Sequence, residues 1–358
     1  MRQKSWSDER DMTTLGELIS LQRGYDLPES VRRPGVVPVV GSAGITGYHD
    51  TVKAKGPGVT LGRSGASYGK VFYVREDYWP HNAALFVTDF KGNDPLFVRY
   101  LLESLDFSSL NSGSAQQSLN RNFVYGLPVA KTPLPEQQRI AGVLSAYDDL
   151  IENNQRRIRI LEEMARALYR EWFVEFRFPG HFTSQWVKSS LGDIPARWRV
   201  RKLGEILELH YGKALKQEIR REGAVPVYGS SGIVGMHDTA LVSGPGIVVG
   251  RKGNVGSVFW SDESFYPIDT VYFVVSKLPL RFLYHDLLSK TFLNSDAAVP
   301  GLNRTQAYSM ETVVPPLELL SRFTLIADDF GKQALLLHAQ CGKLRTMRDL
   351  LLPYLMKG

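Results

Sequence analysis

The stretch VPVYGSSGIVGMHDT at residues 225–239 repeats an earlier stretch, VPVVGSAGITGYHDT, at residues 37–51. Eleven of the fifteen positions are identical, and the two stretches begin 188 residues apart. A match of this length is too long for chance, and the spacing exceeds the period of roughly 20–50 residues that is typical of solenoid repeats. The sequence therefore predicts that one domain occurs twice in the chain.

The same spacing recurs elsewhere in the sequence. LGELISLQRG at residues 15–24 returns as LGEILELHYG at residues 203–212, again 188 positions later. The spacing shrinks to 183 at the tripeptide LNR, which occupies residues 119–121 and 302–304. Such changes of length are tolerated in loops, which lie at the surface. We interpret the two halves of the 358-residue chain as tandem copies of one fold.

Composition indicates a soluble protein with two domains or slightly more. Hydrophobic residues make up 43% of the sequence, which is enough to form cores, and no apolar run approaches the roughly 20 residues that span a bilayer. The first residues have no apolar stretch of the kind that forms a secretory signal. The single cysteine, Cys341, excludes an internal disulfide framework and a Cys-rich zinc site. These observations predict a cytoplasmic protein that does not enter a membrane.

The net charge of +6 is only moderately basic for a chain of this length. It fits an ordinary soluble protein as well as one that binds nucleic acid, so the charge alone does not decide between these classes. The positions of individual basic residues are therefore more informative than their number.

The clearest secondary-structure signal lies between residues 136 and 177. Seam residues, mostly apolar, recur there in alternating steps of four and three, and no Gly or Pro interrupts them after Gly142, which predicts a long helix with a coiled-coil seam. The seam positions are Ile140, Leu144, Tyr147, Ile151, Asn154, Ile158, Leu161, Ala165, Leu168 and Trp172. The positions 183 residues later are Phe323, Ala327, Phe330, Ala334, Leu337, Cys341, Leu344, Arg348, Leu351 and Leu355. Nine of these ten are apolar, so the second copy is predicted to contain the same helix.

Each long helix needs a partner, because an apolar seam exposed along a helix of about 58 Å would be unfavourable. The first candidate is the helix of the other copy. Pseudo-twofold symmetry would then make the pair an antiparallel coiled coil that separates the two globular domains. The alternative is that each helix packs onto its own domain.

The globular segments contain short apolar runs separated by Gly and Pro, which are typical of strands with tight turns. PLFVRYLLESL at residues 95–105 and LRFLYHDLLSK at residues 280–290 predict one short helix in each copy. The predicted fold class is α+β, with two tandem homologous α/β domains and two long helices. The predicted domains are residues 1–134 and 178–316, and the predicted long helices are residues 135–177 and 317–358.

The sequence lacks the common motifs of catalytic sites. The stretches GPGVTLG and GPGIVVG lack the glycine spacing of a dinucleotide site, and no GK[ST] follows them as a P-loop would require. The sequence has no G-x-S-x-G, no H-E-x-x-H, and no Asn-Pro-Pro-Tyr/Phe tetrapeptide with which amino-methyltransferases hold an extruded base. The repeated HDT places His49 beside Asp50 and His237 beside Asp238, but neighbours on a strand point to opposite faces. We therefore predict no catalytic residue, no metal site and no cofactor in this chain.

A polar binding pattern occurs in both copies. Each copy has a Gly-Arg turn, at Arg63 and Arg251, and later a run that ends in Asn-Arg. Arg, Lys, Asn and Gln side chains reach base edges in the major groove of DNA, whereas small residues and backbone N–H groups suit phosphates. The predicted DNA-binding residues are Arg63, Ser64, Tyr68, Lys70, Gln116, Gln117, Asn120, Arg121, Arg251, Lys252, Asn254, Asn303 and Arg304.

Residues that are identical in the two copies have an alternative role. Arg63 and Arg251, like Asn120 and Asn303, could hold turns together instead of reading bases. Two copies that read different bases should differ where bases are read, so the divergent neighbours are the better candidates for base reading. These neighbours are Ser64, Ala66 and Tyr68 against Lys252 and Asn254, and Gln116-Gln117 against Val299-Pro300.

Residues 133–173, PLPEQQRIAGVLSAYDDLIENNQRRIRILEEMARALYREWF, resemble the central conserved region of specificity subunits of type I restriction-modification systems. LGDIPARWRVRKLGEIL at residues 191–207 is similar to the entry to their second target-recognition domain, and the duplicated plan extends the resemblance over nearly all the chain. The resemblance implies two target-recognition domains, each reading one half of a gapped site in double-stranded DNA. It also implies an antiparallel helix pair that sets the gap and docks two adenine-N6 methyltransferase subunits.

The resemblance assigns the chemistry to partner subunits. S-adenosylmethionine would serve the methyltransferase subunits, and ATP with Mg²⁺ would serve separate restriction subunits that translocate and cut DNA. The residues expected in the coiled coil and in subunit docking are Leu144, Ile151, Ile158, Leu161, Leu168, Phe330, Leu337, Leu344 and Leu351. Two other interpretations stay open: an enzyme chain that carries specificity and catalysis together, and an interaction scaffold whose domains do not bind DNA.

Overall fold

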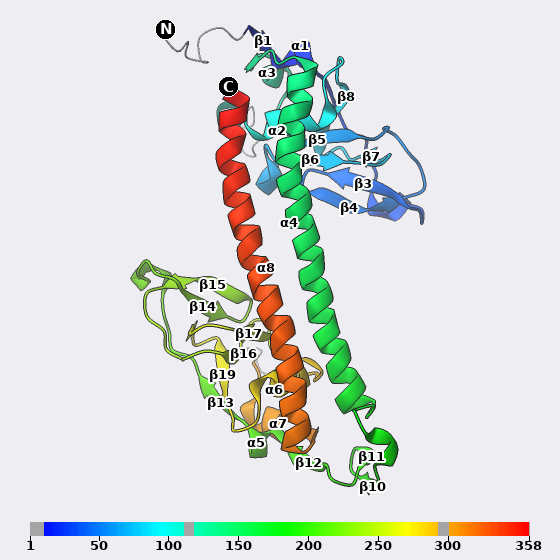
Figure 1. Ribbon diagram of the computed structural model, residues 1–358. Coiled ribbons are helices and arrows are strands. Elements are labelled where there is room, and N and C mark those ends of the chain that lie inside the picture. Colours follow the sequence, from blue (N-terminus) through cyan, green and yellow to red (C-terminus); the bar gives the residue numbers. More distant parts are fainter. Residues whose placement is uncertain (1–10, 111–117, 293–300, 358) are drawn as a thin grey trace, which may run out of the picture. The chain divides into compact units, whose positions relative to one another are not determined.

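The computed structural model describes residues 11–110, 118–292 and 301–357. The chain divides into two compact units: unit 1 is Met1–Gln155 together with His338–Gly358, and unit 2 is Arg156–Leu337. Each unit contains one copy of the repeat and one half of each long helix (Figure 1). This division differs from the four predicted segments, because in the structure each long helix contributes to both units.

Unit 1 is built on a four-stranded sheet with the order β2-β8-β5-β6 and a three-stranded sheet with the order β4-β3-β7. Strands β3 and β7 are parallel, and the other neighbours are antiparallel. A separate antiparallel pair joins β1 to β9. The strands are β1 (Met12–Thr14), β2 (Ser20–Arg23), β3 (Val37–Gly41), β4 (Gly44–His49), β5 (Gly58–Gly62), β6 (Val71–Val74), β7 (Trp79–Pro80), β8 (Ala84–Asp89) and β9 (Pro128–Ala130).

Unit 2 repeats this topology, with the orders β13-β19-β16-β17 and β15-β14-β18 and the pair β12-β20. The hairpin β10-β11 is an addition that has no counterpart in the described part of unit 1. The strands are β10 (Trp186–Ser189), β11 (Gly192–Pro195), β12 (Arg199–Lys202), β13 (Glu208–Tyr211), β14 (Val225–Gly229), β15 (Gly232–His237), β16 (Gly246–Gly250), β17 (Val258–Ser261), β18 (Tyr266–Pro267), β19 (Val271–Val275) and β20 (Glu311–Val314). The predicted duplication of one α+β fold is confirmed.

The described part of each unit also contains three short helices, of which only the middle one is predicted by the sequence. The helices are α1 (Leu15–Leu18), α2 (Pro95–Glu103) and α3 (Arg121–Tyr125) in unit 1, and α5 (Leu203–Ile206), α6 (Leu280–Leu288) and α7 (Arg304–Ser309) in unit 2. Helix α2 begins after Asp94, whose carboxylate accepts a hydrogen bond from the backbone N–H of Phe97 at 2.8 Å. This is an N-cap that satisfies one of the free donors of the first turn. Short 3₁₀ turns occur at Glu29–Val31, Gly65–Ser67, Ser108–Leu110, His181–Thr183 and Gln217–Ile219.

The two long helices are α4 (Leu134–Tyr169), which continues into a π-helical turn at Arg170–Val174, and α8 (Leu317–Lys357). All twenty predicted seam positions are buried or half-buried. In unit 1 the Cys341 Sγ lies 3.8 Å from the Ile151 carbonyl oxygen, and in unit 2 Ile158 packs with Ala334 and Leu337. Residue numbers rise along one helix as they fall along the other, so the halves pair antiparallel, as predicted.

The long helices pack onto the globular parts in addition to pairing with each other, so the alternative, in which each helix packs onto its own domain instead, is wrong. In unit 1, Ile140 and Leu144 of α4 and Met356 of α8 belong to one core with the strands β2, β5 and β8. In unit 2, Trp172 and Phe323 are part of the corresponding core. Among the described residues, no helix is both long and apolar enough to cross a lipid bilayer.

Candidate nucleic-acid interface

The structure brings the two halves of the predicted binding pattern together within each copy. In unit 1 the Leu119 N–H donates a hydrogen bond of 2.8 Å to the carbonyl of Arg63, and in unit 2 the Leu302 N–H donates one of 2.8 Å to the carbonyl of Arg251. The Gly-Arg turn and the Asn-Arg segment are therefore neighbours, although more than fifty residues separate them in the sequence. The arrangement occurs identically in both units.

The repeated arginines of the turns reach the backbone of their own unit. Arg63 Nη1 lies 3.3 Å from the Asn82 carbonyl oxygen, and Arg251 donates from Nε and Nη2 to the Asp269 carbonyl oxygen at 3.1 and 2.6 Å. Both side chains are half-buried. Each arginine thus stabilises its turn. Because a guanidinium has five N–H donors, further donors stay available for a ligand.

The repeated Asn-Arg dipeptides have matching contacts too. The side chain of Asn120 accepts a hydrogen bond from the N–H of Asn122, and that of Asn303 accepts from Thr305, so each asparagine caps a short helix. Arg121 Nη1 lies 3.3 Å from the Leu21 carbonyl oxygen. The equivalent Arg304 Nη1 lies 3.4 Å from the Leu209 carbonyl oxygen. The two asparagines therefore have a structural role, and their contact with DNA stays a prediction.

Three arginines border a hollow in unit 1. Its volume is about 620 Å³, and its lining includes Arg23, Arg63 and Arg121, together with Asp26 and Asn120. Burial, together with the positive charge of Arg23, lowers the pKa of Arg63. The hollow therefore has the cationic lining that an anionic ligand such as a phosphate group requires.

The same place in unit 2 is occupied by an aromatic ring. The guanidinium carbons of Arg251 and Arg304 lie 5.2 and 5.1 Å from the centre of the Tyr211 ring, which is within the range of cation–π contacts. The Tyr272 ring follows at 5.0 Å from that of Tyr211. Arg23 and Tyr211 are missing from the predicted site, although the match of LGELISLQRG with LGEILELHYG already aligns them.

The divergent neighbours of the Gly-Arg turn differ in their exposure to solvent and in their contacts with the protein. In unit 1 the hydroxyl of Tyr68 donates to the Phe107 carbonyl oxygen at 2.9 Å, and burial raises its pKa, whereas Lys70 is exposed. Ser64 pairs with Ser118 in an isolated bridge. In unit 2 Lys252 and Asn254 are exposed, and Asn254 Nδ2 lies 3.3 Å from the hydroxyl of Ser231. Gln116, Gln117, Val299 and Pro300 lie outside the described residues.

The HDT motif braces a hairpin in each copy. The Arg33 N–H donates to Nδ1 of His49 at 3.0 Å, and the Arg33 side chain forms an ion pair with Asp50 at 2.6 Å. The hydrogen bonds from Arg33 and Thr51 lower the pKa of Asp50 to about 2. Arg221, His237 and Asp238 make the same contacts in unit 2. Across residues 11–110, 118–292 and 301–357, no cluster of three His, Cys, Asp or Glu side chains could hold a metal ion.

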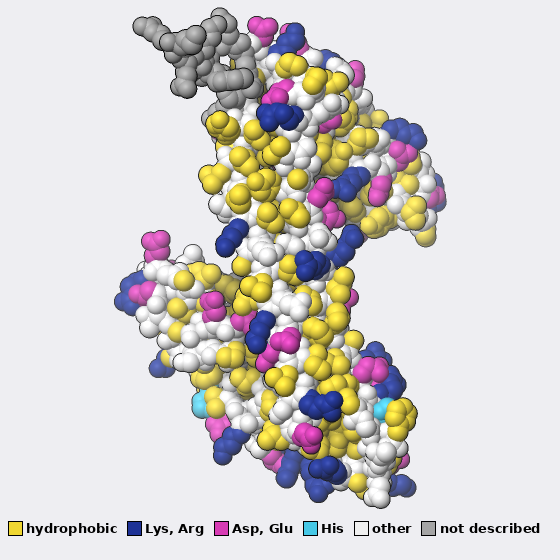
Figure 2. Space-filling model, in the orientation of Figure 1, with side chains coloured by type: hydrophobic (Ala, Val, Ile, Leu, Met, Phe, Trp, Pro, Cys, Tyr) yellow, Lys and Arg dark blue, Asp and Glu magenta, His cyan; other side chains and the backbone are white. Residues whose placement is uncertain are grey.

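The long helices carry a second set of apolar side chains besides the seam. These residues are exposed on α4 and α8, and hydrophobic side chains gather over the unit 1 parts of both helices (Figure 2). In unit 1 they include Val143, Leu150, Met347, Leu350 and Tyr354. In unit 2 they include Ile160, Met164, Leu325, Ile326, Leu335 and Leu336. The predicted docking residues lie in the seam instead, where Leu144 and Ile151 are buried and Leu161 and Leu344 half-buried.

The comparisons with known proteins agree on one family. The family model of the type I restriction modification DNA specificity domain matches residues 8–163 and 195–319. The MjaIX specificity subunit of a type I restriction enzyme from Methanocaldococcus jannaschii is 25% identical over 299 residues, which are 73% of this chain and 68% of that protein. The MjaVIII specificity subunit of the same organism is 23% identical over 207 residues, which are 43% of its length.

Among solved structures, the S subunit of a type I restriction-modification system from M. genitalium is similar over 98% of both chains. The TM-score is 0.65 and the sequence identity 19%. At this identity the likeness shows the fold alone.

Proposed function

Because the chain belongs to the family of type I restriction-modification DNA specificity domains, we propose that it is the subunit that chooses the DNA sequence for such a system. The resemblance found in the sequence is thereby confirmed at the level of the family. Under the proposal, each copy of the repeated domain reads one half of a gapped site in double-stranded DNA. The helices α4 and α8 set the gap between the two halves.

The observation that carries the proposal is the repeated site. Both copies hold an arginine turn beside an Asn-Arg segment with the same backbone hydrogen bond of 2.8 Å. Around this common frame the side chains differ, with Ser64 and Ala66 in one copy and Lys252 and Asn254 in the other. A common frame that contacts the DNA backbone, surrounded by variable side chains that contact bases, is what two readers of different half-sites require.

The chemistry is assigned to other subunits. The helices α4 and α8 would dock two adenine-N6 methyltransferase subunits, which bind S-adenosylmethionine, and restriction subunits that use ATP and Mg²⁺ would complete the complex. The exposed apolar side chains of the helices are candidates for these contacts, because apolar residues exposed in groups mark interaction sites. This chain alone would neither methylate nor cut DNA.

The decisive experiment exchanges one of the two proposed target-recognition domains. Residues 14–132 are replaced by the equivalent part of another specificity subunit, and the methylated sites are mapped by methylome sequencing of cells that contain the methyltransferase subunit. One half of the recognised site should change, while the other half and the gap stay the same. The reciprocal exchange of residues 202–315 is the matched control, and it should change only the other half.

Two outcomes would contradict the proposal. If a single exchange altered both halves of the site, the copies would not be independent readers. If the purified chain with methyltransferase subunits shifted no DNA in an electrophoretic assay, the scaffold interpretation would replace the proposal.

A further inference from the structure

One position beside the repeated arginines differs between the two copies in a way that changes the chemistry of the site. Arg23 is the last residue of β2, and Tyr211 is the last residue of β13. Each is followed by a glycine, Gly24 or Gly212, at which a Cβ would lie 2.2 or 2.1 Å from a backbone carbonyl oxygen. The backbone is therefore equivalent in the two copies, and only the side chain distinguishes them.

In unit 1, Arg23, Arg63 and Arg121 bring three guanidinium groups to the 620 Å³ hollow. Within the described residues, no carboxylate forms an ion pair with any of the three, although Asp26 lines the hollow. Arg63 and Arg121 each have one contact with a carbonyl oxygen, at 3.3 Å. Like charges repel one another, so three unpaired guanidiniums around one space are stable only if solvent or an anion offsets their charge.

In unit 2 the ring of Tyr211 lies near both of the arginines that remain. Arg251 and Arg304 are about equally far from it, at 5.2 and 5.1 Å, and no third cation takes the place of Arg23. Arg251 also has two hydrogen bonds to the Asp269 carbonyl oxygen. The arginines of unit 2 are therefore stabilised by neutral groups of the protein, and those of unit 1 lack an equivalent aromatic partner.

We propose that the hollow formed by Arg23, Arg63 and Arg121 binds a phosphate group of the DNA backbone, and that the equivalent place in unit 2 does not. The planar guanidinium presents paired donors that match two phosphate oxygens, and three such groups from β2, the Gly-Arg turn and α3 surround one space. The inference deepens the proposed function and rests on it. Unit 1 holds its half-site with one more phosphate contact than unit 2.

The test exchanges the two side chains and measures the salt dependence of DNA binding by the chain with its methyltransferase subunits. Each phosphate that a cation neutralises contributes about 0.9 to the slope of log K against log salt concentration. Arg23→Tyr should lower the magnitude of this slope by about one, on cognate and unrelated DNA alike. Tyr211→Arg should raise it by about one. Arg23→Lys keeps the charge and should keep most of the slope.

The control for a general loss of charge is Lys131→Ala, because Lys131 is an exposed residue outside the hollow. An unchanged slope in Arg23→Tyr, or an equal decrease in Lys131→Ala, would overturn the inference while leaving the proposed function intact, provided that the unmodified complex binds DNA. Failure of the unmodified complex to bind DNA would instead refute the proposed function. In a further arm, inorganic phosphate competes with DNA at constant ionic strength. It should displace DNA from the unmodified complex more strongly than chloride does, because the paired guanidinium donors match phosphate oxygens. This difference should be smaller for Arg23→Tyr, and an equal difference in the two complexes would contradict the inference.

Discussion

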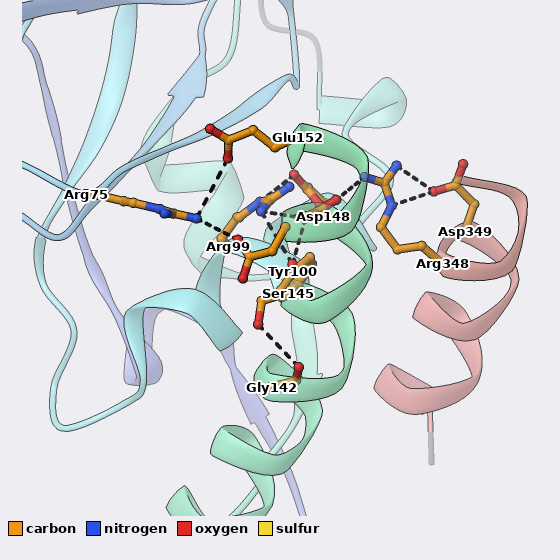
Figure 3. A network of polar contacts seen from close by, with 11 residues as sticks. Arg75, Arg99, Tyr100, Gly142, Ser145, Asp148, Glu152, Arg348 and Asp349 are labelled. Carbon is orange, nitrogen blue, oxygen red and sulfur yellow. Dashed lines mark hydrogen bonds and ion pairs between the residues drawn. The ribbon is translucent and has the colours of Figure 1, made fainter. Parts of the chain in front are cut away.

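The two copies share one fold, and each joins an arginine of its short middle helix to an aspartate of a long helix, but the surroundings of this ion pair differ. In unit 1, Asp148 of α4 forms ion pairs with Arg99 of α2 and Arg348 of α8 (Figure 3). It also accepts a hydrogen bond from the hydroxyl of Tyr100 of α2. The Arg99 and Tyr100 contacts measure 2.8 and 2.7 Å. Burial by itself would raise the pKa of Asp148, but the hydrogen bond from Tyr100 and the charges of both arginines outweigh it and lower the pKa.

In unit 2 the residue at the place of Asp148, 183 positions later, is Gly331. Arg281 of α6 lies against it, and a Cβ at Gly331 would be 2.4 Å from the Arg281 Nη2. The guanidinium of Arg281 lies 3.7 Å from the centre of the Trp260 ring and pairs with Asp328 at 2.7 Å. The residue that corresponds to Arg348 is Ala165.

The comparison shows that a duplicated fold keeps its backbone while its polar contacts are exchanged as sets. In unit 1 two arginines and a tyrosine surround the carboxylate of Asp148, whereas in unit 2 the guanidinium of Arg281 occupies the space beside a glycine. If the short middle helix of one copy were combined with the long-helix segment of the other, a buried charge would therefore be left without a partner. Such an unpaired charge is strongly destabilising.

The largest expected effect tests what the copies have in common, the seam. Leu144 is fully buried in unit 1 and Leu337 is 5% exposed in unit 2. Leu144→Asp and Leu337→Asp should each lower the free energy of unfolding by at least about 4 kcal/mol, because the change leaves both a cavity and a buried charge. Urea unfolding measures this. The controls are Leu150→Asp and Leu336→Asp on exposed positions, which should change stability by less than about 0.5 kcal/mol. Equal effects at seam and control positions would show that the helices are not paired.

The next effect distinguishes the polar contacts of Asp148 in unit 1 from those of Asp328 in unit 2. Asp148→Ala should cost about 2 to 3 kcal/mol, since Arg99 and Arg348 lose their shared partner and keep only Glu103 at 3.0 Å and Asp349 at 2.8 Å. Asp328→Ala should cost less than about 1 kcal/mol, because its side chain is 37% exposed and Arg281 keeps Asp262 as a partner at 3.1 Å. Urea unfolding of both variants measures the loss in the free energy of unfolding. Equal losses would mean that the contacts of Asp148 and Asp328 do not differ as described.

The smallest effect is a pH dependence of stability that arises in unit 2 alone. His285 of α6 occupies the place of Tyr100, and burial, followed by the charges of Arg281 and Arg166, lowers its pKa to about 4. An unfolded histidine has a pKa of about 6.5, so the unfolded chain binds more protons between these values, and stability falls as the pH is lowered from 7. The contribution lost by pH 5 is about 2 kcal/mol.

His285→Tyr, which introduces the residue of unit 1, should abolish this part of the pH dependence. Urea unfolding of the wild-type chain and the variant at a series of pH values between 7 and 5 isolates the histidine, because every other titrating group is common to both. A pH dependence that is identical in the two proteins would contradict the assignment of a neutral buried His285.

The features that sequence predicts best are those that depend on local periodicity. The long helices, α2 and α6, and the duplication follow from spacing alone, and Arg348 stands out as the single non-apolar position of the second seam. Its partner Asp148 is 200 residues away, so the ion pair becomes visible only in the folded chain. The site shows the same limit. Arg63 and Arg251 are recognisable as a repeat, but Arg23 and Tyr211 gain their meaning from β-strands that place them beside those arginines.

The core of unit 1 includes residues from the distal half of α8. Leu351, Leu352 and Leu355 pack against this core, and Met356 is buried within it, together with Ile140 and other residues of the first copy. A ribosome synthesises the first copy and then all of unit 2 before it reaches these residues. The copy that is translated first is thus completed last, and until then it exposes the apolar surface that α8 will cover. We therefore expect the first domain of the nascent chain to be prone to aggregation until the end of α8 has been synthesised.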